Sequence, residues 1–227
     1  MTDNTPSCQE ILQFLRDISA NNERSWFLAN KDRYLRARAD MERLAECVIG
    51  EISAFDPSVA RLTGKDCLYR IYRDVRFSPD KRPYKEHMGC YVNPMGRCSL
   101  HVGYYLHIQP FDRSFVAGGT WQAPTNILNM IRRKIVNRTD EFRAIVEEPH
   151  FKRLFPTITD MPLKVMPRGL PKDFPYPQYV KCRSFCVGHP LPDSFFDDSR
   201  WSTRVGEMFR LMKPFLDFLN EVIDDYA

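Results

Sequence analysis

The chain has 227 residues, of which 43% are hydrophobic and 27% are charged, as in ordinary globular proteins. This length suits one large domain, and the 13% of aromatic residues predicts a core rich in aromatic packing. The net charge of +4 is too small to indicate nucleic-acid binding by itself. We therefore expect a single α+β domain over residues 1–227, with disorder limited to about the first six residues.

Targeting and redox signals are absent from the sequence. The opening MTDNTPSCQE has neither the basic nor the apolar region of a secretory signal. No stretch approaches the roughly 18 apolar residues that a membrane span needs. The seven cysteines are scattered and include no CxxC pair, which favours reduced thiols. These observations predict a cytoplasmic protein with no membrane association.

Two helical segments open the chain. Ser7 and Glu10 form a capping-box pattern, which predicts a helix from about Cys8 to Ser19. The pair 21–22 is typical of a break, with Asn22 able to cap a second helix. Apolar residues at helical spacing then predict one long amphipathic helix to about Ala54.

The hydrophobic period then becomes that of strands. Residues 68–77 alternate between apolar and charged positions and predict a strand with one charged face. Residues 87–93 and 99–108 predict a hairpin around a turn at 94–96, and 114–119 predict a further short strand. Four consecutive strands with short connections indicate an antiparallel sheet.

Helical spacing returns in the second half of the chain. Residues 127–135 predict one helix, and residues 142–146 predict another with Thr139 as its cap. A proline-rich loop, a possible fifth strand and a closing helix are expected at 156–181, 182–188 and 201–222. The expected fold is α+β, with a mainly antiparallel sheet of four or five strands flanked by N-terminal and C-terminal helices.

Four stretches of the chain together resemble one protein family. They are FLRDISANNERSWFLANKDRY (14–34), CLYRIYRDVRFSPDKRPYKEHMG (67–89), GYYLHIQP (103–110) and GGTWQAP (118–124). The family is the bacterial and fungal one catalogued as domain of unknown function 2461 (DUF2461). The resemblance implies a cytoplasmic setting and no required cofactor, and it brings no activity, ligand or catalytic residue.

The segment from Arg70 to Lys85, which we call the basic segment, is the strongest candidate for a site. It combines six basic residues with two acids. Arginine captures phosphate or carboxylate in a bidentate manner, and lysine adds a mobile charge. We expect the ligand-binding residues to be Arg70, Arg73, Arg76, Lys81, Tyr84 and Lys85. Tyr72 and Tyr84 could stack on a base or ring.

The same residue types also fit an internal ion-pair network. Asp74 would then pair with Arg70 or Arg76, and Asp80 would cap a turn. The sequence gives this structural interpretation the same weight as the binding interpretation.

Other patterns in the sequence give weaker evidence of a functional site. Residues 21–27 are explained by capping and packing, and the glycines at 118–119 by a tight turn that lacks nucleotide-binding spacing. His87, His101 and His107 occur on neighbouring predicted strands without the spacing of metal ligands, so no metal site is expected.

Three functions remain open at this point. The first, which ranks highest, is the binding of an anionic small molecule or nucleic acid by the basic segment. The second is an enzyme for an anionic substrate, with Asp74 or Asp80 as acid or base. The third is an assembly protein in which the basic segment is scaffold.

Overall fold

The computed structural model describes residues 6–97, 99–159 and 162–225. The chain divides into two compact units. The first unit contains the residues up to Arg97, with 105–116 and 190–207, and the second contains 98–104, 117–189 and the residues from Met208 onward. The single domain over 1–227 stays a prediction. The expected N-terminal disorder falls mainly on residues 1–5, outside the described residues.

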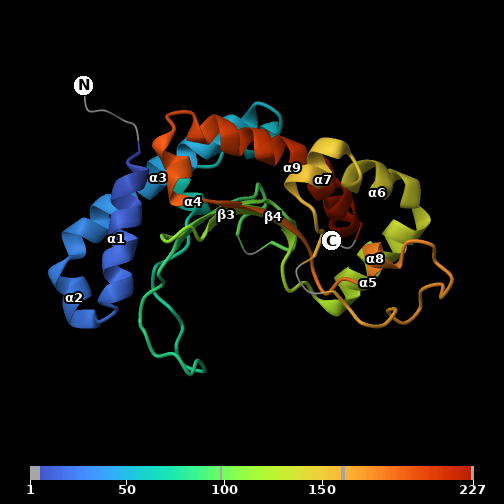
Figure 1. Cartoon of the computed structure of the whole chain (residues 1–227), viewed down its shortest axis with the longest axis horizontal. Helices are drawn as coiled ribbons and strands as arrows, with labels where there is room; N and C mark the ends of the chain where they lie inside the picture. The colour runs from blue at the N-terminus through green and yellow to red at the C-terminus, as the bar shows by residue number, and fades with distance from the viewer. Residues whose placement is uncertain (1–5, 98, 160–161, 226–227) are drawn as a thin grey trace. The chain divides into compact units, whose positions relative to one another are not determined.

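Two helices form the core of the first unit. α1 (Cys8–Ala20) begins where the sequence predicts, because the hydroxyl oxygen of Ser7 accepts a hydrogen bond from the backbone N–H of Glu10. α3 (Lys31–Ser53) packs along α1 (Figure 1). Both helices bury an apolar stripe at helical spacing, which includes Ile11, Leu12, Leu15, Ile18, Met41 and Leu44.

The long helix predicted from Asn22 to Ala54 is wrong, because it is interrupted at Asn30. α2 (Arg24–Ala29) ends there, since the backbone N–H and the side-chain amide of Asn30 both donate to the carbonyl of Trp26. The carbonyl of Asn30 then accepts the first hydrogen bonds of α3. Asn22 is not the cap of α2, because Glu23 occupies that position.

The sheet has four antiparallel strands in the order β1-β2-β3-β4. Its strands are β1 (Met88–Val92), β2 (Tyr104–Ile108), β3 (Ser114–Thr120) and β4 (Phe185–Leu191). The predicted α+β class and the additional strand near 182–188 are therefore confirmed. Helices from both ends of the chain flank the sheet. In the first unit α3 contacts β1, and in the second Met212 of α9 (Trp201–Asp224) lies against Gly118.

Two of the predicted strands are wrong in extent. Residues 68–77 form no strand and meet their neighbours only at the isolated bridges Leu68–Cys90 and Tyr72–Tyr84. The strand predicted over 99–108 begins only at Tyr104. The side-chain amide of Asn220 binds both the N–H and the carbonyl of Val102, and so occupies the groups that a neighbouring strand would use.

The second unit packs helices around an aromatic core. Its helices are α5 (Thr125–Asn137), α6 (Thr139–Val146), α7 (Pro149–Leu154), the short α8 (Pro177–Val180) and the later part of α9. The predicted cap at Thr139 is wrong, because its hydroxyl donates to the carbonyl of Ile135 in the preceding helix. The fully buried phenylalanines of this unit include Phe142, Phe151, Phe155, Phe215 and Phe218.

Three short helices complete the first unit, namely η1 (Pro57–Val59), α4 (Gly64–Cys67) and η2 (Asp193–Asp197). Over the described parts of the chain, none of the helices is both long enough and apolar enough to cross a membrane.

Candidate functional site

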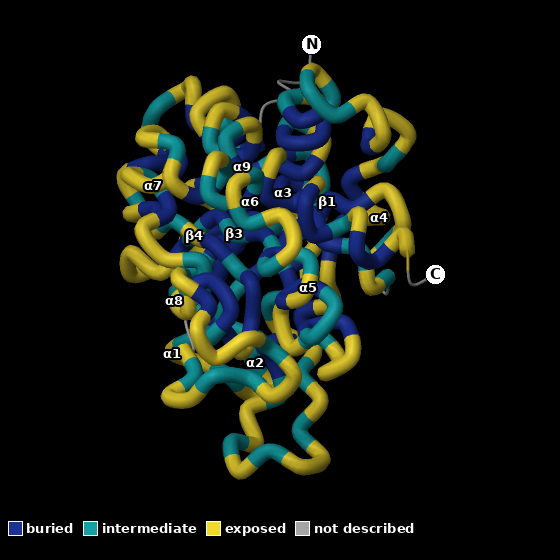
Figure 2. The backbone as a smooth tube through the Cα atoms, turned by 90° about the vertical axis from the view of Figure 1, so that its right-hand side faces the viewer, coloured by how far each residue is buried: buried dark blue, intermediate teal, exposed yellow. Residues whose placement is uncertain are grey.

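The middle of the basic segment forms a projecting loop, residues 73–83, which we call the arm. Its two sides meet where the N–H of Arg73 donates to the carbonyl of Pro83 at 2.9 Å and the N–H of Lys85 donates to that of Ile71 at 2.8 Å. Figure 1 draws the arm as a long teal loop, and Figure 2 shows it as exposed or intermediate along its length. The arm therefore has no apolar core of its own, and polar contacts hold its shape.

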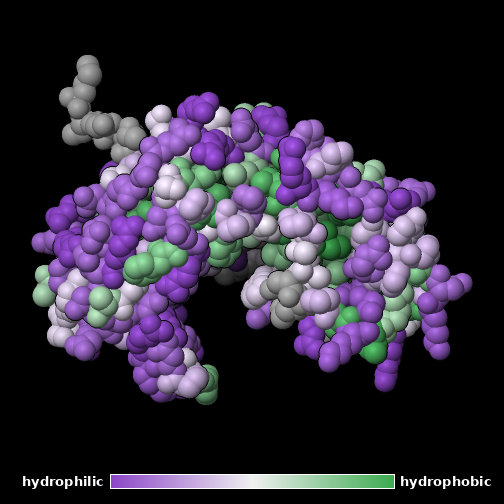
Figure 3. Space-filling model, viewed as in Figure 1, coloured by the Kyte–Doolittle hydropathy of each residue, from purple (hydrophilic) through white to green (hydrophobic). Residues whose placement is uncertain are grey.

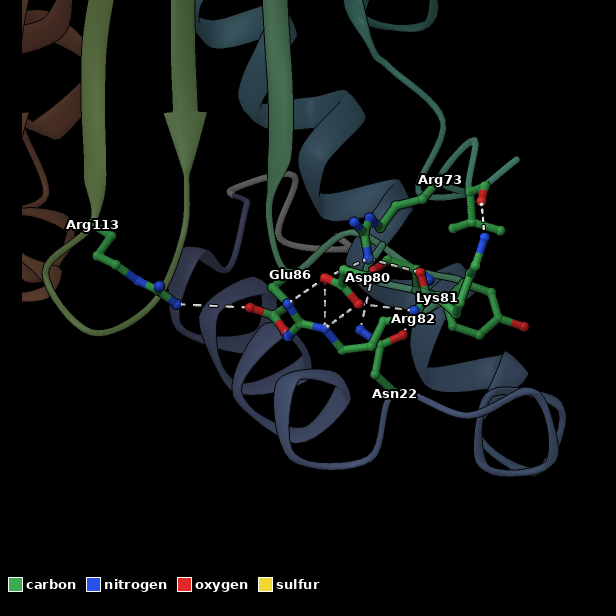
Figure 4. Close-up of polar contacts among 9 residues, drawn as sticks. Asn22, Arg73, Asp80, Lys81, Arg82, Glu86 and Arg113 are labelled. Atoms are coloured by element: carbon green, nitrogen blue, oxygen red, sulfur yellow. Dashed lines mark hydrogen bonds and ion pairs between the residues drawn. The ribbon is translucent and has the colours of Figure 1, made fainter. Parts of the chain in front are cut away.

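Asp80 joins the two sides of the arm. Its carboxylate lies 2.9 Å from a guanidinium nitrogen of Arg73 and 2.7 Å from one of Arg82 (Figure 4). Arg82 also pairs with Glu86, beyond the arm. Lys81 donates to the carbonyl of Val75 at 3.1 Å. Most of the cationic groups of the arm are thus already bound within it.

Asp74 pairs with Arg76, as one interpretation of the sequence predicts. The guanidinium donates twice to the carboxylate, at 3.0 and 2.6 Å. Hydrogen bonds from Arg76 lower the pKa of Asp74, and those from Arg82 lower the pKa of Asp80 far below its usual value. Both carboxylates therefore stay ionised with their oxygens occupied, which disfavours them as acid or base groups.

Tyr84 lies inside the first unit rather than on its surface. Its ring is stacked on that of Phe27 with centroids 4.1 Å apart, and only 4% of the residue is exposed. The side chain of Asn22 holds its backbone, accepting from the N–H at 3.1 Å and donating to the carbonyl at 3.0 Å. We therefore leave Tyr84 out of the candidate ligand contacts. The 21–27 segment has the structural role expected of it, although Asn22 holds this loop instead of capping a helix.

Lys85 and Arg70 differ from the cations of the arm. Neither forms an ion pair with a carboxylate among the residues that the structure describes. The ammonium group of Lys85 lies 5.5 Å from the ring centroid of Tyr69, and the guanidinium of Arg97 lies 5.7 Å from the same ring. Burial and then the charge of Arg70 lower the pKa of Lys85. Lys85 is thus a partly buried cation with no carboxylate counter-ion in the described part of the chain.

A group of aromatic and imidazole rings lies beside Lys85. The rings of His87 and His107 have centroids 4.3 Å apart, and His107 also stacks on Phe115 at 4.4 Å. The hydroxyl of Tyr105 lies 2.9 Å from Nδ1 of His107. We call Tyr69, Lys85, His87, Tyr105 and His107 the histidine cluster.

Strand geometry explains why these residues meet. Side chains two apart on a strand share a face, so Tyr105 and His107 of β2 point the same way. Gly89 on β1 makes room for them, since a Cβ atom there would lie 2.6 Å from the hydroxyl of Tyr105. His87 lies two residues before Gly89, immediately before β1 begins.

The histidines of the cluster are held in the neutral form. Burial, then His107 and Lys85, lower the pKa of His87 to about 3. The pKa of His107 is also lowered, mainly by burial, although its hydrogen bond with Gln109 opposes the shift. Burial raises the pKa of the Tyr105 phenol, which therefore stays protonated. With Nε2 of His107 donating to Gln109, Nδ1 accepts the hydroxyl proton of Tyr105.

A small cavity of about 10 Å³ lies beside the cluster, within the first unit. Tyr69 and Gly89 line it, together with Tyr34 and Arg38 of α3. The cavity has room for about one water molecule, and Lys85 is not among the residues that line it.

The remaining candidates have structural explanations. Gly119 has φ +125°, and a Cβ there would lie 2.0 Å from the carbonyl oxygen of Phe185, so close packing requires glycine. His101 belongs to the second unit, where its Nε2 lies 2.7 Å from Asp224. In the described ranges, no three histidine, cysteine or acidic residues are grouped as metal ligands. Cys98 lies outside the described residues.

The sequence interpretation thus named part of the cluster and missed the rest. Arg70 and Lys85 were expected to bind ligand, whereas His87 and His107 were considered only as metal ligands. Tyr69 and Tyr105 were not proposed. The sequence does contain a signal that could have identified these residues, namely the two-residue spacing of side chains on one face of a strand. Lys85, His87 and Gly89 have this spacing, and so do Tyr105 and His107.

Comparison with known proteins agrees with the resemblance seen in the sequence. Residues 10–218 match the model of the family described as "Conserved hypothetical protein (DUF2461)". The chain belongs to the DUF2461 family. The match covers both the arm and the histidine cluster of this DUF2461 protein. Neither the curated proteins nor the solved structures include a match.

Proposed function

We propose that this protein binds a small anionic molecule, bearing a phosphate or carboxylate group, through Arg70 and Lys85 of the basic segment. The observation that carries the proposal is the partly buried Lys85, which has no carboxylate partner among the described residues. Burying a cation costs free energy, and here no anion of the described chain offsets that cost. A ligand anion would offset it.

The charges around Lys85 support the same proposal. The permanently charged groups that shift the pKa of Lys85, His87 and His107 are cations, namely Arg70, Arg113 and Lys85. Glu86 is adjacent in sequence, but its carboxylate is bound by Arg82 and lies 4.0 Å from Arg113 (Figure 4). The positive potential at the cluster is therefore not cancelled by the nearest acid.

The arm has a supporting role in this proposal. Its arginines are paired with its own aspartates, so they have less capacity for a ligand than Lys85 has. Figure 3 shows the arm as mainly hydrophilic, with a more hydrophobic patch at its tip. The setting we propose for the protein is the cytoplasm, in keeping with the six described cysteines, which are free thiols.

A thermal-shift screen tests the proposal. Wild type is screened with sugar phosphates, nucleotides, dicarboxylates and short oligonucleotides, and each shift is compared between Lys85→Met and an Arg76→Ala, Lys81→Ala double variant. A ligand at a hundred times its Kd stabilises the native state by about 2.7 kcal/mol. We expect a shift that weakens with salt, disappears in Lys85→Met and persists in the double variant.

The two variants separate the possible outcomes. A shift lost in the double variant but kept in Lys85→Met would assign binding to the arm and contradict the proposal. A response to oligonucleotides alone would favour nucleic acid over a small molecule. No shift with any anion would show that the basic segment serves structure only.

A further inference from the structure

His87, like Lys85, has free hydrogen-bonding capacity among the residues that the structure describes. Both ring nitrogens of His107 are engaged, Nδ1 with Tyr105 and Nε2 with Gln109, each at 2.9 Å. The ring of His87 stacks on His107, and neither of its nitrogens bonds to another residue in the described chain. The side chain is only partly exposed. A nitrogen of His87 is therefore available to a ligand that Lys85 attracts.

The groups that face His87 explain why it carries no proton in the free protein. From β2 it meets the imidazole of His107, and from its own segment the ammonium of Lys85. Arg113, immediately before β3, acts on His107. Glu86 is held by Arg82 and so does not act as the counter-ion. Burial and positive neighbours both penalise an imidazolium at this position.

A bound anion would reverse the effect of the positive neighbours on the protonation of His87. A negative group at Lys85 offsets the repulsion from the cations and attracts a proton to His87. The imidazolium would then donate an N–H to the anion and form a charge-assisted hydrogen bond. Arg70, Lys85 and a protonated His87 together carry three positive charges, so a doubly charged anion offsets more of this charge than a singly charged one.

We propose that the ligand group is a doubly charged anion of the phosphate class, and that His87 binds it and takes up one proton when it does. The inference rests on the proposed function, because it requires an anion at Lys85. It adds the charge of the ligand, a further binding residue and a dependence of affinity on pH. Because binding and proton uptake are linked, lower pH favours the bound state.

Sulfate is a suitable probe, because it keeps two charges across the pH range in which histidine titrates. The Kd of sulfate is measured by calorimetry between about pH 8 and pH 5.5, in two buffers with different ionisation enthalpies. The difference in binding enthalpy between the two buffers gives the number of protons taken up on binding. We expect affinity to rise as the pH falls, by up to about tenfold per pH unit for one proton.

Three matched comparisons identify the residue that takes up the proton and the charge of the ligand. His87→Gln should remove the proton uptake and the pH dependence, whereas His150→Gln, at an exposed site beside Glu148, should change neither. Methyl sulfate has the same tetrahedral group with one charge and should bind at least about tenfold more weakly than sulfate. In the wild type, the imidazole nitrogens of His87 should move to the shifts of the protonated ring when sulfate is added, which tests the inference even if His87→Gln folds poorly.

The outcomes distinguish this inference from the function on which it rests. Sulfate binding that requires Lys85 but involves no proton uptake, or the same uptake in His87→Gln, would overturn the inference and leave the proposed function standing. Equal affinity for sulfate and methyl sulfate would overturn the charge assignment. No binding of sulfate would overturn the inference and leave the proposed function to the screen of the other anions. Binding unaffected by Lys85→Met would contradict both.

Discussion

Individual residues of the histidine cluster depend on space that the backbone provides. Gly89 is the clearest case, because a Cβ atom there would lie 2.6 Å from the phenol oxygen of Tyr105 and 2.8 Å from its ring. The obstacle is a side chain, so a larger residue would move Tyr105 rather than the strand. The hydrogen bond between Tyr105 and His107 would then be lost.

We expect Gly89→Ala to destabilise the protein by about 1–3 kcal/mol through overpacking. The imidazole signals of His107 should change, because Nδ1 loses its donor. Gly50→Ala is the matched control, since a Cβ there meets nothing within 4 Å on α3 and should stabilise the helix by about 0.5–1 kcal/mol. Urea unfolding and nitrogen NMR measure the two effects. Unchanged His107 signals in Gly89→Ala would contradict this account of Tyr105.

At the scale of elements, the arm shows how a loop without an apolar core keeps its shape. Asp80 bonds to Arg73 on one side and Arg82 on the other, so its carboxylate closes the loop. Asp74 and Arg76 are two residues apart on the same side of the arm, so their ion pair does not connect its two sides. The two aspartates are therefore chemically alike and structurally different.

We expect Asp80→Asn to speed trypsin cleavage within 73–83, because the loop opens more often, while the melting temperature changes little. Trypsin should cleave the Asp74→Asn variant at close to the wild-type rate. Time courses followed by mass spectrometry locate the cut. Equal acceleration in both variants would show that the charge of the arm, rather than its closure by Asp80, controls access.

At the scale of the whole molecule, the two cluster histidines make stability depend on pH. His87 has a pKa of about 3 in the folded chain, and that of His107 is also lowered, against about 6.5 in the unfolded chain. Below pH 6.5 the unfolded state therefore binds protons that the folded state does not. The contribution of His87 is complete above that pH and is lost as the pH falls toward 3.

We expect the free energy of unfolding, measured without binding anions, to fall between about pH 6.5 and 4, by up to about 1.4 kcal/mol per pH unit for each histidine. A His87→Gln, His107→Gln double variant should lose most of that slope, and urea titrations at several pH values measure it. If the slope persists in the double variant, other groups set the acid sensitivity.

The α+β class and most helices could be predicted from the sequence, because caps and hydrophobic spacing act locally, while the family was indicated by the resemblance of four stretches of the chain. The capped start of α1 and the closing helix α9 are examples. The break at Asn30 was missed, since apolar spacing continues through it while its amide binds Trp26. The strand over 68–77 was predicted wrongly for a related reason, because alternation favours a strand but does not show whether a continuous ladder with a partner forms.

The order of the residues concentrates cations between Arg70 and Lys85, but which of these cations have counter-ions depends on how the chain folds. Ion pairing depends on distances of a few ångströms, and these depend on where the arm folds back on itself. Asp80 thereby neutralises Arg73 and Arg82, while Lys85 lies beside the rings of the cluster without a carboxylate partner among the described residues. The histidines became candidates for the same reason, because strand pairing places the rings of His87 and His107 together although twenty residues separate them in the chain.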